Sequence, residues 1–160
     1  MRYGYFDDEH REYVITDPRT PVKWINYIGT LNFGGFVDHT GGALLCRQDP
    51  ALNRITKYIS QMPAGEFKGT TLYLRIREGQ GWRVFSPFYV PTLDVYERYE
   101  CRIGLGYTRL DTQFYGIRCV TTIFVPQGGE CELREGMLHP PAGPGLGVEI
   151  DADALRAHRL

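Results

Sequence analysis

An acidic residue and an imidazole stand side by side at Asp38 and His39, next to the glycine pair Gly41-Gly42. Glycine lets a ligand or a partner backbone approach closely, so this segment is a candidate binding loop. The alternative is structural, because the side chains of Asp38 and Thr40 can also hydrogen-bond the amides of a tight turn. Both interpretations stay open at this point.

Aromatic side chains supply a second possible chemistry, the stacking of sugar rings. Trp24 and Tyr27 are the candidates for such contacts, because their rings combine an apolar face with a polar edge. Aromatic residues of this kind also fill cores and pack between sheets. The wider set open to both interpretations is Trp24, Tyr27, Trp82, Phe85, Phe88 and Tyr89.

Charged residues offer one further candidate, Arg102. Glu100 and Arg102 are two residues apart in an expected strand and therefore share one of its faces. Either the two side chains form an ion pair, or Arg102 binds an anionic group of a ligand. The acidic cluster at 7–10 is interpreted as an exposed turn rather than a metal site.

Recognisable catalytic motifs are missing, so no catalytic residue and no metal ligand is assigned. The sequence has no nucleophile elbow, no phosphate-binding loop, no zinc-protease motif and no dinucleotide fingerprint. Four cysteines, at 46, 101, 119 and 131, are spaced too widely for a zinc site. They are expected to be reduced thiols, of which Cys46 and Cys119 suit a core.

Charge and hydropathy exclude several classes of partner. The 160 residues include 18 basic and 19 acidic side chains, so a net charge of -1 gives no attraction to nucleic acid or to anionic membranes. No apolar run reaches the roughly 18 residues of a membrane-spanning helix. Residues 1–8 contain no apolar segment typical of secretory signals, and a cytoplasmic location is therefore expected.

Short apolar or alternating segments separated by glycine and proline predict an all-β domain that positions these residues. The clearest strand is 71–77, and residues 35–38 and 43–46 predict a hairpin around the Asp38 loop. Without amphipathic helices to cover a sheet, about eight or nine strands indicate an antiparallel β-sandwich. The other expected strands are 12–15, 24–28, 82–86, 99–103, 107–114 and 117–125.

The composition changes after residue 134, which divides the chain into a β-sandwich domain, 1–134, and a tail, 135–160. Glycine and proline are frequent in residues 136–147 and predict irregular structure there. One short helix is expected at 151–159, because Asp151 can cap its first turn.

Several collinear motifs of the sandwich domain point to a known family. They are Arg2-Tyr3-Gly4-Tyr5-Phe6-Asp7-Asp8, Trp24-Ile25-Asn26-Tyr27-Ile28-Gly29, Thr40-Gly41-Gly42, Tyr99-Glu100-Cys101-Arg102 and Gly104-Leu105-Gly106-Tyr107-Thr108-Arg109. This pattern resembles the start of the glycoside hydrolase family 94 phosphorylases, which include cellobiose, cellodextrin, chitobiose and oligoglucan phosphorylases. Ile103 replaces a histidine of several members, and residues 34–39 are more similar to the oligoglucan type than to the cellobiose type.

That resemblance implies an incomplete galactose-mutarotase-like supersandwich that packs on an (α/α)₆ catalytic barrel or on a second subunit. The family performs inverting phosphorolysis of β-linked gluco-oligosaccharides, with inorganic phosphate as co-substrate and no other cofactor. Its catalytic acid belongs to the barrel, so this chain is expected to be inactive alone. Trp24, Tyr27, Asp38, His39 and Arg102 are the residues expected to contact substrate or partner and to shape the active-site entrance.

Two alternatives remain beside this interpretation. One is a free-standing sugar-binding module that uses Trp24 and Tyr27, and the other is an interaction domain without enzymatic activity. Phe85, Phe88 and Tyr89 are expected to form an exposed apolar patch where such a domain would pack. The tail from residue 135 onward resembles the C-terminal end of mandelate-racemase-type enolase superfamily enzymes, where it carries no chemistry.

Overall fold

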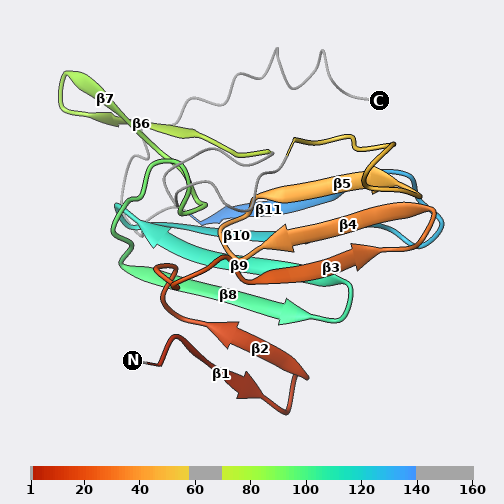
Figure 1. Ribbon diagram of the computed structural model, residues 1–160. Helices are drawn as coiled ribbons and strands as arrows, with labels where there is room; N and C mark the ends of the chain where they lie inside the picture. The colour runs from red at the N-terminus through yellow and green to blue at the C-terminus, as the bar shows by residue number, and fades with distance from the viewer. Residues whose placement is uncertain (1, 58–69, 140–160) are drawn as a thin grey trace.

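The computed structural model describes residues 2–57 and 70–139, and this part of the chain forms strands, turns and loops without a helix (Figure 1). These residues accordingly contain no helix with the length and apolar character needed to span a membrane. The strands are β1 (Gly4–Asp7), β2 (Glu12–Ile15), β3 (Ile25–Gly29), β4 (Phe33–Asp38), β5 (Ala43–Arg47), β6 (Leu74–Glu78), β7 (Gly81–Phe85), β8 (Arg98–Gly104), β9 (Tyr107–Phe114), β10 (Ile117–Phe124) and β11 (Leu133–His139).

The larger sheet contains six strands in the order β1-β2-β8-β9-β10-β11, and every neighbouring pair is antiparallel. Tight turns join β8 to β9 and β9 to β10. Gly106 and Gly116 adopt φ values of 82° and 71° in these turns, a conformation that costs glycine little. The register aligns Cys101 with Leu110 and Leu110 with Thr121, so that one face of the sheet presents a continuous set of core residues.

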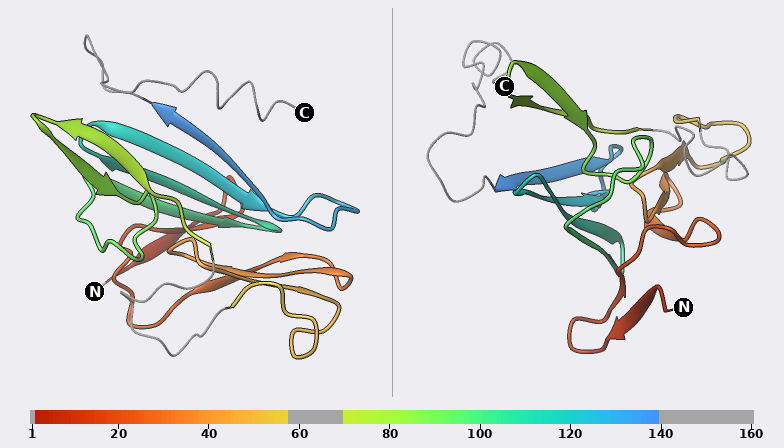
Figure 2. Two further views of the ribbon diagram at one scale, coloured as in Figure 1. Left: turned by 90° about the horizontal axis from the view of Figure 1, so that it is seen from above. Right: turned by 90° about the vertical axis from the view of Figure 1, so that its left-hand side faces the viewer.

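A three-stranded sheet, β3-β4-β5, covers that face, and Figure 2 shows the two sheets as separate layers. Asn26 of β3 reaches across and donates hydrogen bonds to the carbonyl oxygens of Gly104 (3.1 Å) and Tyr107 (2.7 Å). Burial of apolar side chains from both sheets stabilises this antiparallel β-sandwich, which confirms the predicted fold class. The core includes Ile15, Cys101, Leu110 and Ile123 from the larger sheet and Ile28, Val37, Ala43 and Leu45 from the smaller one.

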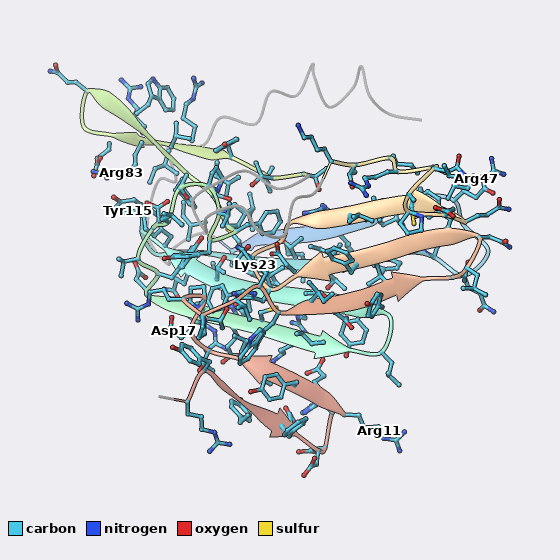
Figure 3. The ribbon with its side chains drawn as sticks, in the orientation of Figure 1. Arg11, Asp17, Lys23, Arg47, Arg83 and Tyr115 are labelled. Carbon is cyan, nitrogen blue, oxygen red and sulfur yellow. The ribbon has the colours of Figure 1, made fainter. Side chains whose placement is uncertain are left out.

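The hairpin β6-β7 forms a separate two-stranded sheet at one end of the sandwich (Figure 1). Its last residue, Phe85, is buried against Ile117 and Cys119 of β10. The Arg83 guanidinium lies 4.9 Å from the centroid of the Tyr115 ring, in the turn between β9 and β10 (Figure 3). These contacts attach the hairpin to the larger sheet, while most of its side chains stay outside the core.

The four cysteines are unpaired, and Cys46, Cys101 and Cys119 are buried while Cys131 is exposed. Burial raises the pKa of Cys101, and it raises the pKa of Cys119 to about 11. These two thiols are therefore protonated near neutral pH and act as small apolar core residues.

Both edge strands of the larger sheet differ from the expectations based on sequence. β1 was not predicted, and β11 continues to His139, where irregular structure was expected. The prediction for residues 136–147 is therefore wrong for 136–139, and the expected boundary at residue 134 falls inside β11. The rest of the tail, including the expected helix at 151–159, lies outside the described residues.

Candidate functional site

Arg102 lies at the centre of a cluster of acidic side chains on the outer face of the larger sheet. Its Nη1 atom donates hydrogen bonds to Asp7 at 3.0 Å and to Glu12 at 2.9 Å. Its Nε atom donates to Glu100 at 3.3 Å, which confirms the predicted ion pair of these two residues. The strand order explains the cluster, because β2 lies between β1 and β8 and pairs with both. Three carboxylates around Arg102 disfavour the binding of a further anion there.

This cluster favours the ionised forms of Asp7 and Glu12. Hydrogen bonds from His10 and Arg102 lower the pKa of Asp7 to about 2. Burial by itself raises the pKa of Glu12, but hydrogen bonds from Tyr107 (2.5 Å) and Arg102 outweigh burial, and the net shift is downward. The ion pairs therefore join β1, β2 and β8, and the hydrogen bond from Tyr107 adds β9.

Asp38 ends β4 and is completely buried. Its Oδ1 atom accepts hydrogen bonds from the Thr40 amide (2.7 Å), the Thr40 hydroxyl (2.6 Å) and the Gly42 amide (3.2 Å). Gly41 has a φ of 80°, and a Cβ atom there would lie 2.7 Å from the Phe88 ring. The structure therefore shows the structural role of Asp38, whose carboxylate accepts hydrogen bonds from amides of the turn between β4 and β5.

His39 fastens the segment before β3 to this turn and is 1% exposed. Its Nδ1 atom accepts a hydrogen bond from the Trp24 amide (3.3 Å), and its Nε2 atom lies 2.9 Å from the carbonyl oxygen of Pro18. A carbonyl oxygen only accepts, so Nε2 carries the proton and the imidazole is neutral. Burial lowers the pKa of His39, in agreement with a neutral ring.

An open groove of about 590 Å³ lies on the outer face of the three-stranded sheet. Tyr27, Phe36 and Leu44 stand opposite one another on β3, β4 and β5 and form an apolar row along it. The rings of Tyr27 and Phe36 meet edge to face, with centroids 6.4 Å apart and planes at 82°. The Tyr27 side chain is 74% exposed. Among the described residues, those that line the groove carry no charged side chain.

Three of the residues that line this groove are glycines. A Cβ atom at Gly29, Gly34 or Gly35 would lie 2.4, 2.5 or 1.9 Å from a backbone oxygen of a neighbouring segment. Side chains are therefore excluded from these positions by backbone packing. The same close packing that joins β3, β4 and β5 creates the hollow beside Tyr27.

The five predicted contact residues do not form one site. His39 is buried beside Asp38, and Trp24 is partly buried against the core, with the two ring centroids 6.5 Å apart. Tyr27 and Arg102 are on opposite outer faces, because each alternates along its strand with core residues of its own sheet. Contact of these five residues with a substrate or partner stays a prediction, and Tyr27 is the one whose ring is largely open to solvent.

The other aromatic candidates have different environments. Phe85 and Phe88 are each 1% exposed, so the predicted apolar patch at these residues is wrong: both side chains belong to the core. Trp82 is 56% exposed on the separate hairpin, where the Arg75 guanidinium lies 4.2 Å from its ring centroid.

Sequence analysis missed two residues of the groove, Phe36 and Leu44. Their alignment with Tyr27 depends on the register of three strands, which no local pattern specifies. The only available signal was the predicted hairpin at 35–46, which placed both residues on adjacent strands.

Four carboxyl groups of the described residues are poorly suited to donate protons. Those whose pKa departs from the ordinary value, Asp7, Glu12, Asp17 and Asp111, all shift downward. The cause in each case includes hydrogen bonds from an arginine. A general acid at neutral pH needs a raised pKa instead.

Comparison with known proteins gives one family and several relatives. The family model "Glycosyl hydrolase 94, supersandwich domain" matches residues 11–139. The N,N'-diacetylchitobiose phosphorylase of Vibrio furnissii is 37% identical over 134 residues, which are 83% of this chain and 16% of that protein. The enzyme of the same name from Vibrio proteolyticus is 35% identical over 136 residues, with the same two shares.

A relative with a different named substrate matches the same fraction of its own length. The 3-O-beta-D-glucopyranosyl-beta-D-glucuronide phosphorylase of Paenibacillus borealis is 32% identical over 131 residues, which are 82% of this chain and 16% of that protein. The chain therefore spans about one sixth of the length of the curated relatives it matches.

Proposed function

Because the chain belongs to the glycosyl hydrolase 94 family through its supersandwich domain, we propose that it is the N-terminal, non-catalytic domain of an inverting glycoside phosphorylase. The complete enzyme would cleave a β-linked gluco-oligosaccharide with inorganic phosphate and release a sugar 1-phosphate. The relatives support a phosphorylase, and their different names leave the sugar as part of the proposal.

The downward pKa shifts of the carboxyl groups are the observation that carries this proposal. Inverting cleavage needs a carboxylic acid that is still protonated at neutral pH, so that it can protonate the leaving oxygen. Arginine partners keep Asp7, Glu12 and Asp111 ionised, and none of these groups can serve as that acid. We propose that the acid comes from a catalytic barrel domain or a second subunit.

The domain would act by packing against this catalytic part and shaping the entrance to its active site. The turn held by Asp38 is suited to such a role, because buried hydrogen bonds give it one conformation. His39 adds to this rigidity by tying the preceding loop to the turn. A cytoplasmic location is proposed along with this function.

Complementation tests the proposal. A version of the Vibrio furnissii phosphorylase that lacks the part matched by this chain would be mixed with the purified chain, inorganic phosphate and a panel of β-linked disaccharides. We expect the chain to raise sugar 1-phosphate release about tenfold or more and to co-elute with the truncated enzyme, since missing positioning contacts reduce rates strongly. No stimulation and no co-elution, in a truncated enzyme that regains activity with its own domain, would contradict the proposal.

A further inference from the structure

We propose that the groove over β3, β4 and β5 is a binding site for an uncharged oligosaccharide, with a sugar ring against Tyr27. The inference rests on the proposed function only for the carbohydrate class of the ligand. The position of the site follows from the structure of the sheet itself.

The size of the groove fits a small molecule. Its volume of about 590 Å³ falls within the roughly 300–1,000 Å³ that is common for small-molecule sites. Twelve residues line it, whereas a stable protein interface engages about 20–30 residues on each side. A short oligosaccharide therefore fits this hollow better than a folded partner does.

The aromatic row gives the groove an apolar wall of fixed orientation. Phe36 meets Tyr27 edge to face, and this contact restricts the Tyr27 ring although 74% of the side chain is exposed. A pyranose has C–H groups on its faces and hydroxyl groups around its edge. Such a ring can cover apolar surface at Tyr27 and Leu44 while its hydroxyl groups remain hydrated.

The lack of charge in the described lining of the groove determines which class of sugar can bind there. Within residues 2–57 and 70–139, the lining contains no lysine, arginine or histidine that could neutralise a phosphate or a uronic acid, and no carboxylate that could bind an amino sugar. The polar groups on its rim are neutral, namely the hydroxyl of Thr30 and the amide of Gln48. Gln48 has a φ of 62° at the end of β5, a conformation that sets the direction of the chain there. Neutral hydroxyl and amide groups are suited to sugar hydroxyls.

Titration of the full chain with cellotetraose and with chitotetraose, followed by calorimetry and by NMR shifts of backbone amides, tests this inference. We expect one of the two probes to bind with a Kd of about 1 mM or tighter and to shift the amides of Gly29, Gly34 and Gly35. Tyr27→Ala should weaken binding about tenfold or more, since aromatic anchors carry much of the energy of such contacts. Because Tyr27 is exposed, this variant is expected to fold normally.

Trp82→Ala is the matched control, because it removes another exposed aromatic ring on a different sheet. It should leave the affinity unchanged, and glucose 1-phosphate should not compete with the bound oligosaccharide. The inference is overturned by a failure of both probes to bind at 10 mM or so, by equal losses in the two variants, or by competition from glucose 1-phosphate. Since this test needs no catalytic partner, its failure would leave the complementation result intact, and the reverse also holds.

Discussion

At the scale of single residues, ion pairs on the outer face of the larger sheet connect strands that are distant in sequence. Arg102 is 22% exposed and contacts carboxylates from three strands, and the side chain of Glu12 is only 7% exposed. Partly buried charges of this kind depend on one another, because each carboxylate has lost water that its partner replaces. The cluster is therefore expected to matter more for stability than an exposed surface pair.

Replacement of Arg102 tests this dependence. Arg102→Met should lower the free energy of unfolding by about 1–3 kcal/mol, because Glu12 would keep a buried carboxylate without its cation. Arg109→Met on the same face is the control, since Arg109 is exposed, and its effect should stay within about 0.5 kcal/mol. Urea unfolding followed by tryptophan fluorescence measures both. Equal effects of the two substitutions would show that the cluster has no special role.

His39 makes stability depend on pH. Its pKa is lowered in the folded chain by burial, and the unfolded chain takes up the proton first as pH falls below about 6.5. The free energy of unfolding should therefore decrease as pH falls, by at most about 1.4 kcal/mol per pH unit for this one group. Lys23 and Asp38 are the charged groups that act on the imidazole, in opposite directions.

The measurement uses a His10→Gln background, because Asp7 raises the pKa of His10 and gives a contribution of opposite sign, lost as pH rises. In that background, His39→Gln should flatten the pH dependence between about pH 6.5 and 5. NMR titration of the His39 ring in the unmodified chain provides a second measurement if the variant does not fold. A His39 pKa at or above 6.5 or so would contradict this account.

Sequence predicted part of this residue scale. Glu100 and Arg102 are two residues apart in one strand, and this spacing was sufficient to predict their ion pair. Asp7 and Glu12 were not foreseen as partners, because they are about 90 residues away in sequence and meet Arg102 only through the order of strands. The sequence also could not decide between a binding role and a turn-stabilising role for Asp38, since both roles use the same residue types.

At the scale of elements, close backbone packing defines the three-stranded sheet. Gly35 of β4 lies so near to β5 that a Cβ atom would be 1.9 Å from the Leu44 carbonyl oxygen. Gly35 therefore contributes both to the lining of the groove and to the pairing of β4 with β5.

Gly35→Ala should destabilise the chain by about 2 kcal/mol or more, because β4 and β5 would have to separate. Gly136→Ala is the control in strand β11, where the nearest atom to an added Cβ lies at an ordinary 3.6 Å. This control should be neutral or slightly stabilising. Thermal unfolding of both variants by circular dichroism gives the comparison. A stable Gly35→Ala chain with unchanged amide shifts in β5 would refute the predicted clash.

Sequence predicted most elements, and the failures have a common cause. Alternating hydrophobicity and glycine turns identified the central strands, which are buried on at least one face. β1 and β11 are edge strands with few buried side chains, so their hydrophobic patterns are weak. Prolines just beyond residue 139 also favoured irregular structure, although they lie outside β11 itself.

At the scale of the whole molecule, β11 is the last strand at one edge of the larger sheet in the part of the chain that the structure describes. Only β10 pairs with this strand among the described residues, and its apolar side chains Leu133, Met137 and Leu138 are 43%, 59% and 55% exposed. An exposed strand edge with apolar side chains readily pairs with another chain. The relatives, about six times longer than the matched region, have additional chain available to cover such an edge.

Self-association of the isolated chain is the expected consequence. Sedimentation equilibrium should give a weight-average mass above the 18.3 kDa of the monomer. The double variant Met137→Lys/Leu138→Lys should move the mass toward that of the monomer, because charges on an edge strand oppose pairing. Leu105→Lys is the control at a turn, where the side chain is 95% exposed, and it should have no effect. A monomeric parent chain would contradict this prediction.

At the scale of the whole molecule, the sequence predicted most through its collinear motifs. The resemblance across residues 1–134 anticipated both the sandwich and the family, and the family match over residues 11–139 confirms them. Packing of one sheet on the other could not be specified in detail, because it depends on which face of each strand is buried. The five predicted contact residues illustrate this, since they are distributed between the core and two opposite outer faces.

The most direct test of the central claim is an assay of phosphorolysis by the purified chain alone. Cellobiose, longer β-linked gluco-oligosaccharides and N,N'-diacetylchitobiose would each be incubated with inorganic phosphate, and sugar 1-phosphate would be measured. We predict no release above the background without protein, because we assign the catalytic acid to a part of the enzyme outside this chain, and Asp7, Glu12 and Asp111, whose pKa values are lowered by arginine partners, are poor proton donors. Release of sugar 1-phosphate that is abolished by Glu12→Gln or Asp111→Asn, in a variant that still folds, would contradict the assignment of a non-catalytic domain.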